Sequence, residues 1–185
     1  DKPFDVDITD DAVLEDEKET TFSLIRGVAA GMKEAGYRIG GFDAAVTSTV
    51  AGGSGLSSSA ALEVMLTGVF DSLYNRFDMP YVLRAQISQR AENVYFGKPC
   101  GLMDQMACAV GGFVYIDFED PKNPVIEKQS FDLSSAGYNL CITDTGGNHA
   151  DLNEDYASVP CEMKAVAREL GGEVLPICSD ISKPE

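Results

Sequence analysis

Basic residues are scarce in this 185-residue sequence, which has 14 Lys and Arg against 30 Asp and Glu and a net charge of −16. Proteins that bind duplex nucleic acid draw much of their affinity from basic residues on phosphates. The charge balance therefore disfavours a nucleic-acid partner. A nucleotide ligand is still compatible with it, because backbone N–H groups and a metal ion can hold a small phosphate in an acidic protein.

Long hydrophobic runs and paired cysteines are also missing. No apolar run reaches the length of about 18 residues that a membrane-spanning helix needs, and no basic-then-apolar leader opens the sequence, so we expect neither a membrane anchor nor export. The five cysteines are odd in number and scattered, without a C-x-x-C pair, and His149 is the one histidine. These absences argue against a disulfide framework or a zinc site and favour a reducing cytoplasm.

The residues that are present have an ordinary globular composition, 44% hydrophobic and 24% charged. Apolar residues at helical spacing predict helices that start near Thr20 and end at Gly36, and that cover 62–73, 83–94 and 159–170. Runs rich in β-branched and aromatic residues predict strands at 42–50, 112–118, 125–131 and 138–145. Hairpin-like strands late in the chain favour an α+β fold over a regular parallel βαβ repeat.

A glycine- and serine-rich loop precedes the second predicted helix, in the string VAGGSGLSSSAALEV from Val50 to Val64. A strand, a glycine loop and a helix together direct backbone N–H groups at a phosphate, because the first N–H groups of a helix have no partner within the helix. Glycines let the backbone come close, and serine hydroxyls add donors or oxygen ligands for Mg²⁺. The string is neither a P-loop nor G-x-G-x-x-G. On composition alone, a serine helix cap is the plainer interpretation.

The identity of the string GGSGLSSSAALE goes further, because it closely resembles the second signature of the GHMP small-molecule kinases, and most closely that of the galactokinases. In that family the loop wraps the phosphates of ATP at a helix N-terminus. The resemblance implies phosphate contacts from Gly53, Ser54, Gly55, Leu56, Ser57, Ser58, Ser59 and Ala60.

A second segment, AENVYFGKPCGLMDQMACAVGG, resembles the galactokinase segment that carries a catalytic aspartate and a metal-binding glutamate. The resemblance implies that Asp104 contacts the sugar and acts as its base, and that Glu92 and Ser59 hold Mg²⁺. These residue types suit phosphoryl transfer, which needs positioning and charge neutralisation, and suit Mg²⁺, which prefers oxygen ligands. Without the resemblance, Glu92 on a solvated helix face and Asp104 as a helix cap would be the plainer interpretations.

A third segment, DTGGNHADLNEDYASVPCEM, resembles the galactokinase region in which a tyrosine contacts the sugar, and implies that role for Tyr156. The resemblance implies that 1–146 belongs to the N-terminal ATP-binding GHMP kinase domain, with a ribosomal protein S5 domain 2-like fold, and that 147–185 begins the C-terminal domain. The first and third signatures of the family are absent from the sequence. We therefore expect an incomplete domain, an internal fragment with little or no kinase activity by itself.

The function implied by the resemblance is an ATP-dependent sugar 1-kinase that uses Mg²⁺, with ATP as co-substrate, galactose as the expected sugar and the cytoplasm as its location. Three alternatives stay open: another sugar such as N-acetylgalactosamine, a non-catalytic sugar sensor, and a remnant that binds nothing. We expect the parent protein to be a monomer. The fragment itself is expected to self-associate through apolar faces that lack their partners.

Overall fold

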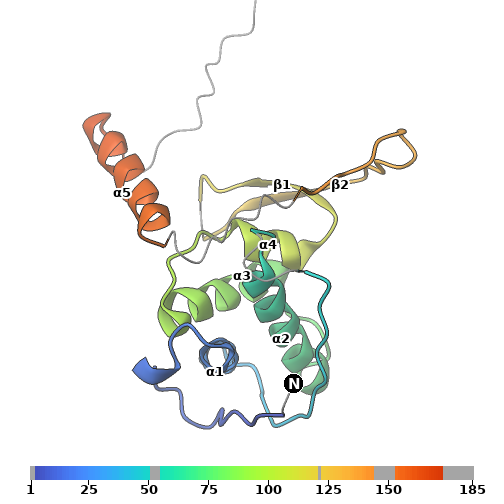
Figure 1. The fold of residues 1–185 in the computed structure, drawn as a ribbon, viewed down its shortest axis with the longest axis vertical. Helices are drawn as coiled ribbons and strands as arrows, with labels where there is room; N and C mark the ends of the chain where they lie inside the picture. The colour runs from blue at the N-terminus through green and yellow to red at the C-terminus, as the bar shows by residue number, and fades with distance from the viewer. Residues whose placement is uncertain (1–2, 51–54, 121, 144–152, 173–185) are drawn as a thin grey trace, which may run out of the picture. The chain divides into compact units, whose positions relative to one another are not determined.

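Helices make up most of the computed structural model, which describes residues 3–50, 55–120, 122–143 and 153–172, the last range with side chains from 158 onward. The chain divides into two units, Asp1–Asn148 and His149–Glu185. The first unit contains helices α1 to α4 and a β-hairpin, and the second contains α5 (Figure 1). The predicted domain boundary between 146 and 147 lies outside the described residues and stays a prediction.

Helix α1 (Thr21–Glu34) is buried along most of its length. It begins after Thr20, whose backbone is extended, and Gly36 follows its end with a φ of +82°, a conformation that favours glycine. The predicted start and stop of this helix are therefore confirmed.

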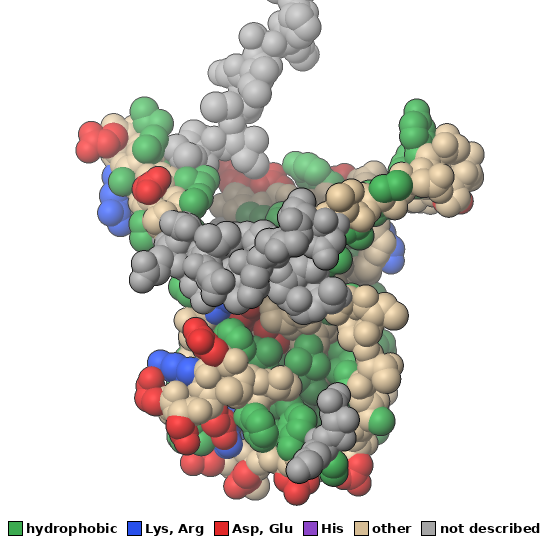
Figure 2. Space-filling view, viewed as in Figure 1, with side chains coloured by type: hydrophobic (Ala, Val, Ile, Leu, Met, Phe, Trp, Pro, Cys, Tyr) green, Lys and Arg blue, Asp and Glu red, His purple; other side chains and the backbone are tan. Residues whose placement is uncertain are grey.

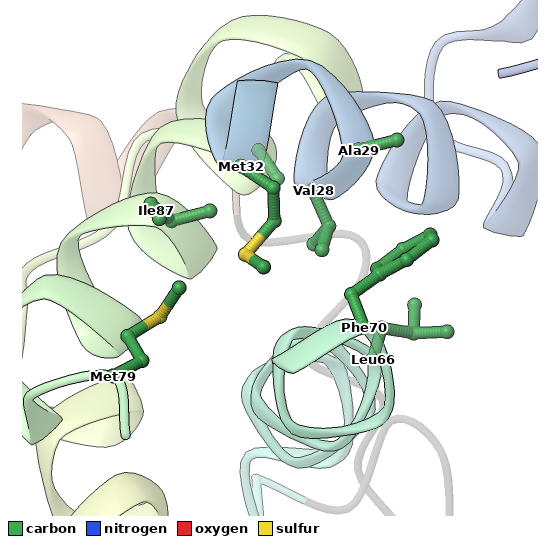
Figure 3. Close-up of a cluster of buried hydrophobic side chains, with 8 residues drawn as sticks. Val28, Ala29, Met32, Leu66, Phe70, Met79 and Ile87 are labelled. Atoms are coloured by element: carbon green, nitrogen blue, oxygen red, sulfur yellow. The ribbon is translucent and has the colours of Figure 1, made fainter. Parts of the chain in front are cut away.

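The main core of the first unit lies between α1, α2 (Ser58–Tyr74) and α3 (Tyr81–Arg90). Figure 3 shows Val28 and Met32 of α1 directed toward the space that Phe70 of α2 also enters. Full burial of a side chain of this size contributes about 1.5–3 kcal/mol. The helix predicted from the apolar spacing at 62–73 is confirmed by α2, and the one at 83–94 is confirmed by α3 together with the helical segment that continues it.

Helix α3 continues directly into η2 (Ala91–Phe96), a π-helical segment that ends at Gly97, whose φ is +88°. Its bonding is one residue longer than in an α-helix, as in the 3.0 Å bond from the N–H of Gly97 to the carbonyl of Glu92. The longer turn changes which side chains face inward, so that Glu92 and Tyr95 are buried whereas Val94 is 45% exposed. The regular spacing placed Val94 on the apolar face, and this prediction was wrong.

Helix α1 lies very close to α3 and η2 because two residues on one of its faces are glycines. A Cβ atom added to Gly27 would lie 2.9 Å from the Cα of Ala91, and one added to Gly31 would lie 2.8 Å from Cγ2 of Ile87. The two glycines are four residues apart and so share one face of the helix. Larger side chains at these positions would push the helices apart.

A buried ion pair joins α2 to α3. One oxygen of Asp71, Oδ2, lies 2.9 Å from Nη2 of Arg84 and also accepts the backbone N–H of Met79 at 3.0 Å. The Asp71 side chain is fully buried and Arg84 is 6% exposed. Removing one partner of such a pair typically costs about 3–5 kcal/mol, because the other charge stays buried.

The short helix α4 (Met103–Val110) lies in a segment for which the sequence predicted no helix. A β-hairpin follows it. Strands β1 (Phe113–Asp117) and β2 (Val125–Gln129) pair antiparallel. The hairpin packs on α4 through a second, smaller apolar cluster. That cluster is built on Ala85, Leu102 and Met106, with Ile116 and Ile126 against it. The strands predicted at 112–118 and 125–131 are confirmed.

The strands predicted at 42–50 and 138–145 are wrong, as far as the described residues go. Both segments have the composition of strands, but a strand needs neighbours for its backbone N–H and C=O groups. Within the described ranges, only β1 and β2 pair with each other. Phe42 packs edge-on against Phe70 instead, and Leu140 is 76% exposed. The α+β prediction holds in a coarser form, as mixed helices with a small two-stranded sheet.

Hydrophobic side chains reach the surface of the first unit between acidic ones (Figure 2). Those of Leu73 and Phe77 are 56% and 58% exposed, at the end of α2, and they line a groove with Phe42 and Met65. This exposure is consistent with the expected unpartnered apolar faces. Self-association of the chain stays a prediction.

In the second unit, α5 (Asn153–Glu169) confirms the last predicted helix. Gly171 follows it with a φ of +82°, as expected for a helix stop. Pro160 lies inside the helix and removes one backbone hydrogen bond, since proline has no N–H. No helix in the described ranges has the length and apolar character needed to cross a bilayer.

We expect Gly27→Ala to lower the free energy of unfolding by about 1–3 kcal/mol, because the new methyl group would overlap the backbone of Ala91. Gly68→Ala in α2 is the matched control. Its Cβ would meet no atom closer than 3.8 Å, so the higher helix propensity of alanine should raise stability by about 0.5–1 kcal/mol. Urea denaturation followed by circular dichroism measures both variants. Effects of equal sign would contradict the tight packing of α1 on η2.

Candidate functional site

The end of the glycine-serine loop leads into α2 through residues with left-handed backbone. Gly55 has a φ of +74°, and Ser57, directly before the helix, has φ 57° and ψ 42°. Such a conformation costs a residue other than glycine on the order of 1–3 kcal/mol and is concentrated at functional sites. The two predicted phosphate contacts Gly53 and Ser54 lie outside the described residues.

The first turn of α2 leaves its backbone N–H groups without a side-chain cap, since Ser57 makes no capping hydrogen bond. Ser57 therefore does not act as the serine cap that composition alone allowed. Ser58 and Ser59 follow in the first turn and are half-buried, and Ala60 is buried. Free N–H groups at a helix N-terminus, together with the helix dipole, favour an anion at this point.

The hydroxyl of Ser57 donates a hydrogen bond of 2.6 Å to Oδ2 of Asp104. Asp104 lies in the first turn of α4 and is exposed, so its carboxylate is accessible to a small molecule. An acidic side chain in the first turn of a helix interacts favourably with the helix dipole. The fold thus brings the serine loop next to the predicted catalytic aspartate, 47 residues along the chain.

The hydroxyl of Ser59 donates a hydrogen bond of 2.8 Å to Oε1 of Glu92. Glu92 is only 3% exposed, and the nearest cation to that oxygen is Nζ of Lys98 at 3.8 Å. A hydroxyl and a carboxylate are the kinds of ligand that Mg²⁺ takes from a protein beside phosphates and water. Within the described ranges, no group of three or more His, Cys, Asp and Glu side chains is arranged for a metal ion. The metal role of Ser59 and Glu92 stays a prediction.

Behind Glu92 lies a buried arrangement that we call the amide bridge, formed by Glu63 of α2, Gln105 of α4 and Glu92 of η2. Nε2 of Gln105 donates to Oε2 of Glu92 at 2.8 Å and to Oε2 of Glu63 at 3.2 Å. Gln105 and Glu63 are both fully buried. One amide thus connects two carboxyl groups in the interior, and Lys98 is the cation that lies within 4 Å of Glu92.

The amide bridge changes the protonation of Glu63. Burial raises the pKa of Glu63 from its usual 4.5 to about 8, and the negative charge of Glu92 adds to the rise. The hydrogen bond from Gln105 and the charge of Lys98 act in the opposite direction. Glu63 therefore holds its proton in the folded chain at neutral pH.

Cys100 lies against the same group, with its Sγ atom 3.6 Å from Nε2 of Gln105. Burial, followed by the negative charge of Glu92, raises the pKa of the Cys100 thiol. A thiol that keeps its proton is a poor nucleophile, so we assign Cys100 no chemical role at this site.

The sequence analysis missed Glu63, Lys98 and Gln105. A signal existed for Glu63, because it follows Ser59 by four residues and so shares its face of the helix. Gln105 directly follows Asp104 in the segment that resembles galactokinases. Lys98 has no local signal, since the turn after η2 is what returns it toward Glu92.

Two residues named in the sequence analysis cannot be placed at the site, because the structure does not describe their side chains. Tyr156 lies on α5 in the second unit, and its side chain is outside the described residues, so its contact with a sugar stays a prediction. His149 is also outside the described residues.

Comparison with known proteins agrees with the geometry. Residues 23–112 match the N-terminal domain of the GHMP kinases, and this range runs from within α1 to the end of α4 and includes the serine loop, Glu92 and Asp104. The chain carries a GHMP kinase N-terminal domain. Its relatives define it further, as a homologue of the galactokinases.

The galactokinase of Streptomyces coelicolor is 36% identical over 176 residues, which is 94% of this chain and 44% of that protein. The galactokinase of Pyrococcus furiosus is 38% identical over 145 residues, 78% of this chain and 39% of that protein. The galactokinase of Thermotoga petrophila is 33% identical over 147 residues, 80% of this chain and 41% of that protein. The chain spans less than half the length of these relatives.

We expect the free energy of unfolding to decrease between about pH 5 and pH 9, because Glu63 binds a proton more tightly in the folded chain than in the unfolded one. Its contribution is complete below the unfolded pKa of 4.5 and is lost as the pH rises through the folded value of about 8. The slope from this single group reaches at most about 1.4 kcal/mol per pH unit.

Glu63→Gln removes the titrating group and keeps the shape, so the variant should show a smaller slope and exceed the wild type in stability above about pH 8. Urea denaturation at several pH values measures this difference. Glu127→Gln, at an exposed position on β2, is the control and should keep the wild-type slope. Parallel slopes for the wild type and Glu63→Gln would contradict a protonated Glu63.

Proposed function

We propose that this chain binds the phosphates of Mg²⁺-ATP at the start of α2 and forms the nucleotide part of an ATP-dependent sugar 1-kinase site. One observation carries the proposal: two serines at the start of α2 each donate to one of two carboxylates, Ser57 to Asp104 and Ser59 to Glu92. This arrangement supports a site in which nucleotide phosphates at the start of α2 would meet both a metal carboxylate and an acceptor carboxylate.

The phosphate contacts would come from the uncapped N–H groups of the first turn of α2 and from the serine hydroxyls. Ser59 and Glu92 offer the oxygen ligands for Mg²⁺, at a buried carboxylate whose nearest cation is 3.8 Å away. When bound, Mg²⁺ would neutralise charge that develops on the β- and γ-phosphates.

Asp104 would hold the anomeric hydroxyl of the sugar and accept its proton as the oxygen attacks the γ-phosphorus. The bond from that phosphorus to the bridging oxygen of the β-phosphate then breaks, and ADP leaves with the bonding electrons. Ser57 bonds Oδ2 of Asp104 and so orients the carboxylate, whose second oxygen can take the proton.

Galactose is the sugar that we propose, because the relatives reported above are galactokinases. The same proposal includes an incomplete S5 domain 2-like fold for 1–146, a sugar contact from Tyr156 and a cytoplasmic location. Because the chain spans less than half the length of these relatives, we expect little or no kinase activity from the chain alone.

We expect the chain to bind ATP in the presence of Mg²⁺, and we expect Ser59→Ala and Glu92→Gln each to weaken that binding about tenfold or more. Isothermal titration calorimetry measures the affinities. Ser72→Ala is the matched control, because this exposed serine lies on the same helix far along from the loop, and it should leave the affinity unchanged. A folded chain that binds no Mg²⁺-ATP would overturn the proposal.

The acceptor role of Asp104 requires an assay of turnover. In a chimaera of the Streptomyces coelicolor galactokinase, this chain would replace the matching 176-residue segment. There, Asp104→Asn should lower kcat for galactose by about 10²- to 10⁴-fold, the usual worth of a general base. Affinity for Mg²⁺-ATP should hold at the wild-type value in the same variant. A variant with full kcat would exclude Asp104 as the base, and Asp132→Asn, at an exposed turn, is the control.

A further inference from the structure

Glu92 presents its two oxygens to two different partners. Oε1 accepts the Ser59 hydroxyl at 2.8 Å, on the side of the serine loop, and Oε2 accepts the amide of Gln105 at 2.8 Å, on the buried side. The side chain of Glu92 therefore has one oxygen for the loop and one oxygen that is held from behind. This division sets the orientation of the carboxylate plane.

Glutamine at position 105 is well suited to hold the carboxylate of Glu92 in this orientation. A glutamine amide nitrogen carries two hydrogens and no charge, so it can donate to Glu92 and Glu63 at the same time. A lysine or arginine would add a positive charge beside Glu92 and compete with a metal ion, and a glutamate would add a third carboxyl group. Gln105 is also fully buried, so water does not compete for its hydrogens.

We propose that Gln105 is a positioning residue that acts through Glu92 and aims Oε1 of Glu92 at the serine loop. The inference rests on the proposed role of Glu92 toward Mg²⁺. Glu63 also accepts a hydrogen bond from the amide of Gln105 and holds it in place. Side chains of α2 and α4 therefore set the orientation of Glu92 on η2. Gln105 itself touches neither nucleotide nor sugar.

The competing explanation is purely structural: the amide would only satisfy two buried carboxylates and so stabilise the packing of α2, η2 and α4. Both explanations predict a loss of stability when the amide is removed. They differ in the effect of Mg²⁺ on nucleotide affinity, because only a positioning role links Gln105 to the metal ion. The ratio of ATP affinity with Mg²⁺ to ATP affinity in EDTA is therefore the decisive measurement.

The test compares the wild type with Gln105→Met, which keeps a similar volume and removes the donor. We expect Gln105→Met to reduce the gain in ATP affinity from Mg²⁺ by about 10- to 100-fold, as is typical when a partner behind a metal ligand is lost. ATP affinity in EDTA should stay at the wild-type value. Calorimetry at a temperature well below the unfolding transition measures both.

Gln89→Met is the matched control, because Gln89 is a nearby glutamine whose amide donates to the carbonyl of Cys100 at 3.2 Å and to no carboxylate. It undergoes the same chemical change and should keep the full effect of Mg²⁺. If Gln105→Met does not fold, Gln105→Asn replaces it, since the shorter side chain stays polar but cannot span both carboxylates. We expect the same loss of the Mg²⁺ effect.

The outcomes separate the two proposals. One outcome contradicts only the positioning role: Mg²⁺ raises ATP affinity in the wild type, Glu92→Gln abolishes this effect, and Gln105→Met or Gln105→Asn keeps it. In that case the proposed function stands. If Mg²⁺ has no effect in the wild type, or if Glu92→Gln keeps the effect, then the metal role of Glu92 fails and the positioning role fails with it. Loss of the effect in the Gln105 variants, with Gln89→Met normal, supports both.

Discussion

The close approach of α1 to η2 at Gly27 is the contact on which the rest of the first unit depends. Without a Cβ at this position, the helix axis can come near enough that an added atom would lie 2.9 Å from both Ala91 and Tyr95. Protein interiors are close-packed, so such a contact determines the position of its neighbour within narrow limits. The neighbour here is the π-helical segment that carries Glu92, and its position sets how the carboxylate meets the serine loop. The packing of the core therefore also determines the geometry of the site.

Buried acidic groups are the second constraint, and they are stabilised differently at the two ends of α2. Toward the C-terminal end, Asp71 is paired with Arg84 and stays an ion pair in an apolar surrounding. Toward the N-terminal end, no cation of the described residues forms an ion pair with Glu63, and burial raises its pKa to about 8, which favours its protonated form at neutral pH. Two ionised carboxylates sharing one amide would repel each other, and protonation of Glu63 relieves that repulsion. Of the two carboxyl groups, Glu92 is the one that accepts the Ser59 hydroxyl at the start of α2.

Helix bounds could be predicted from the sequence because they depend on neighbours in the chain: Thr20 and Gly36 mark the limits of α1, and Gly171 marks the end of α5. The strands were predictable only where two of them meet in a hairpin. Residues 42–50 have the same β-branched composition but pair with no strand in the described ranges, so the strand predicted from their composition was wrong. The prediction of which residues of η2 face inward was wrong for another reason. A longer hydrogen-bonded turn cannot be recognised from apolar spacing, and this turn moves Val94 to the surface. The site residues Asp104 and Glu92 were reachable through the resemblance of their segments, whereas Lys98 was not.

The sequence by itself determined most of the helical segments, the position of the glycine-serine loop before α2 and the family to which its motifs point, because each of these depends on residues adjacent in the chain or on the identity of a short string. Only the tertiary structure decided that Ser57 meets Asp104 and that Ser59 meets Glu92, pairs that are 47 and 33 residues apart. It also decided that Glu63 is buried beside Glu92 and keeps its proton. Protonation and hydrogen bonding depend on burial and on charges within a few ångströms, and the fold brings those groups together from three separate helical segments.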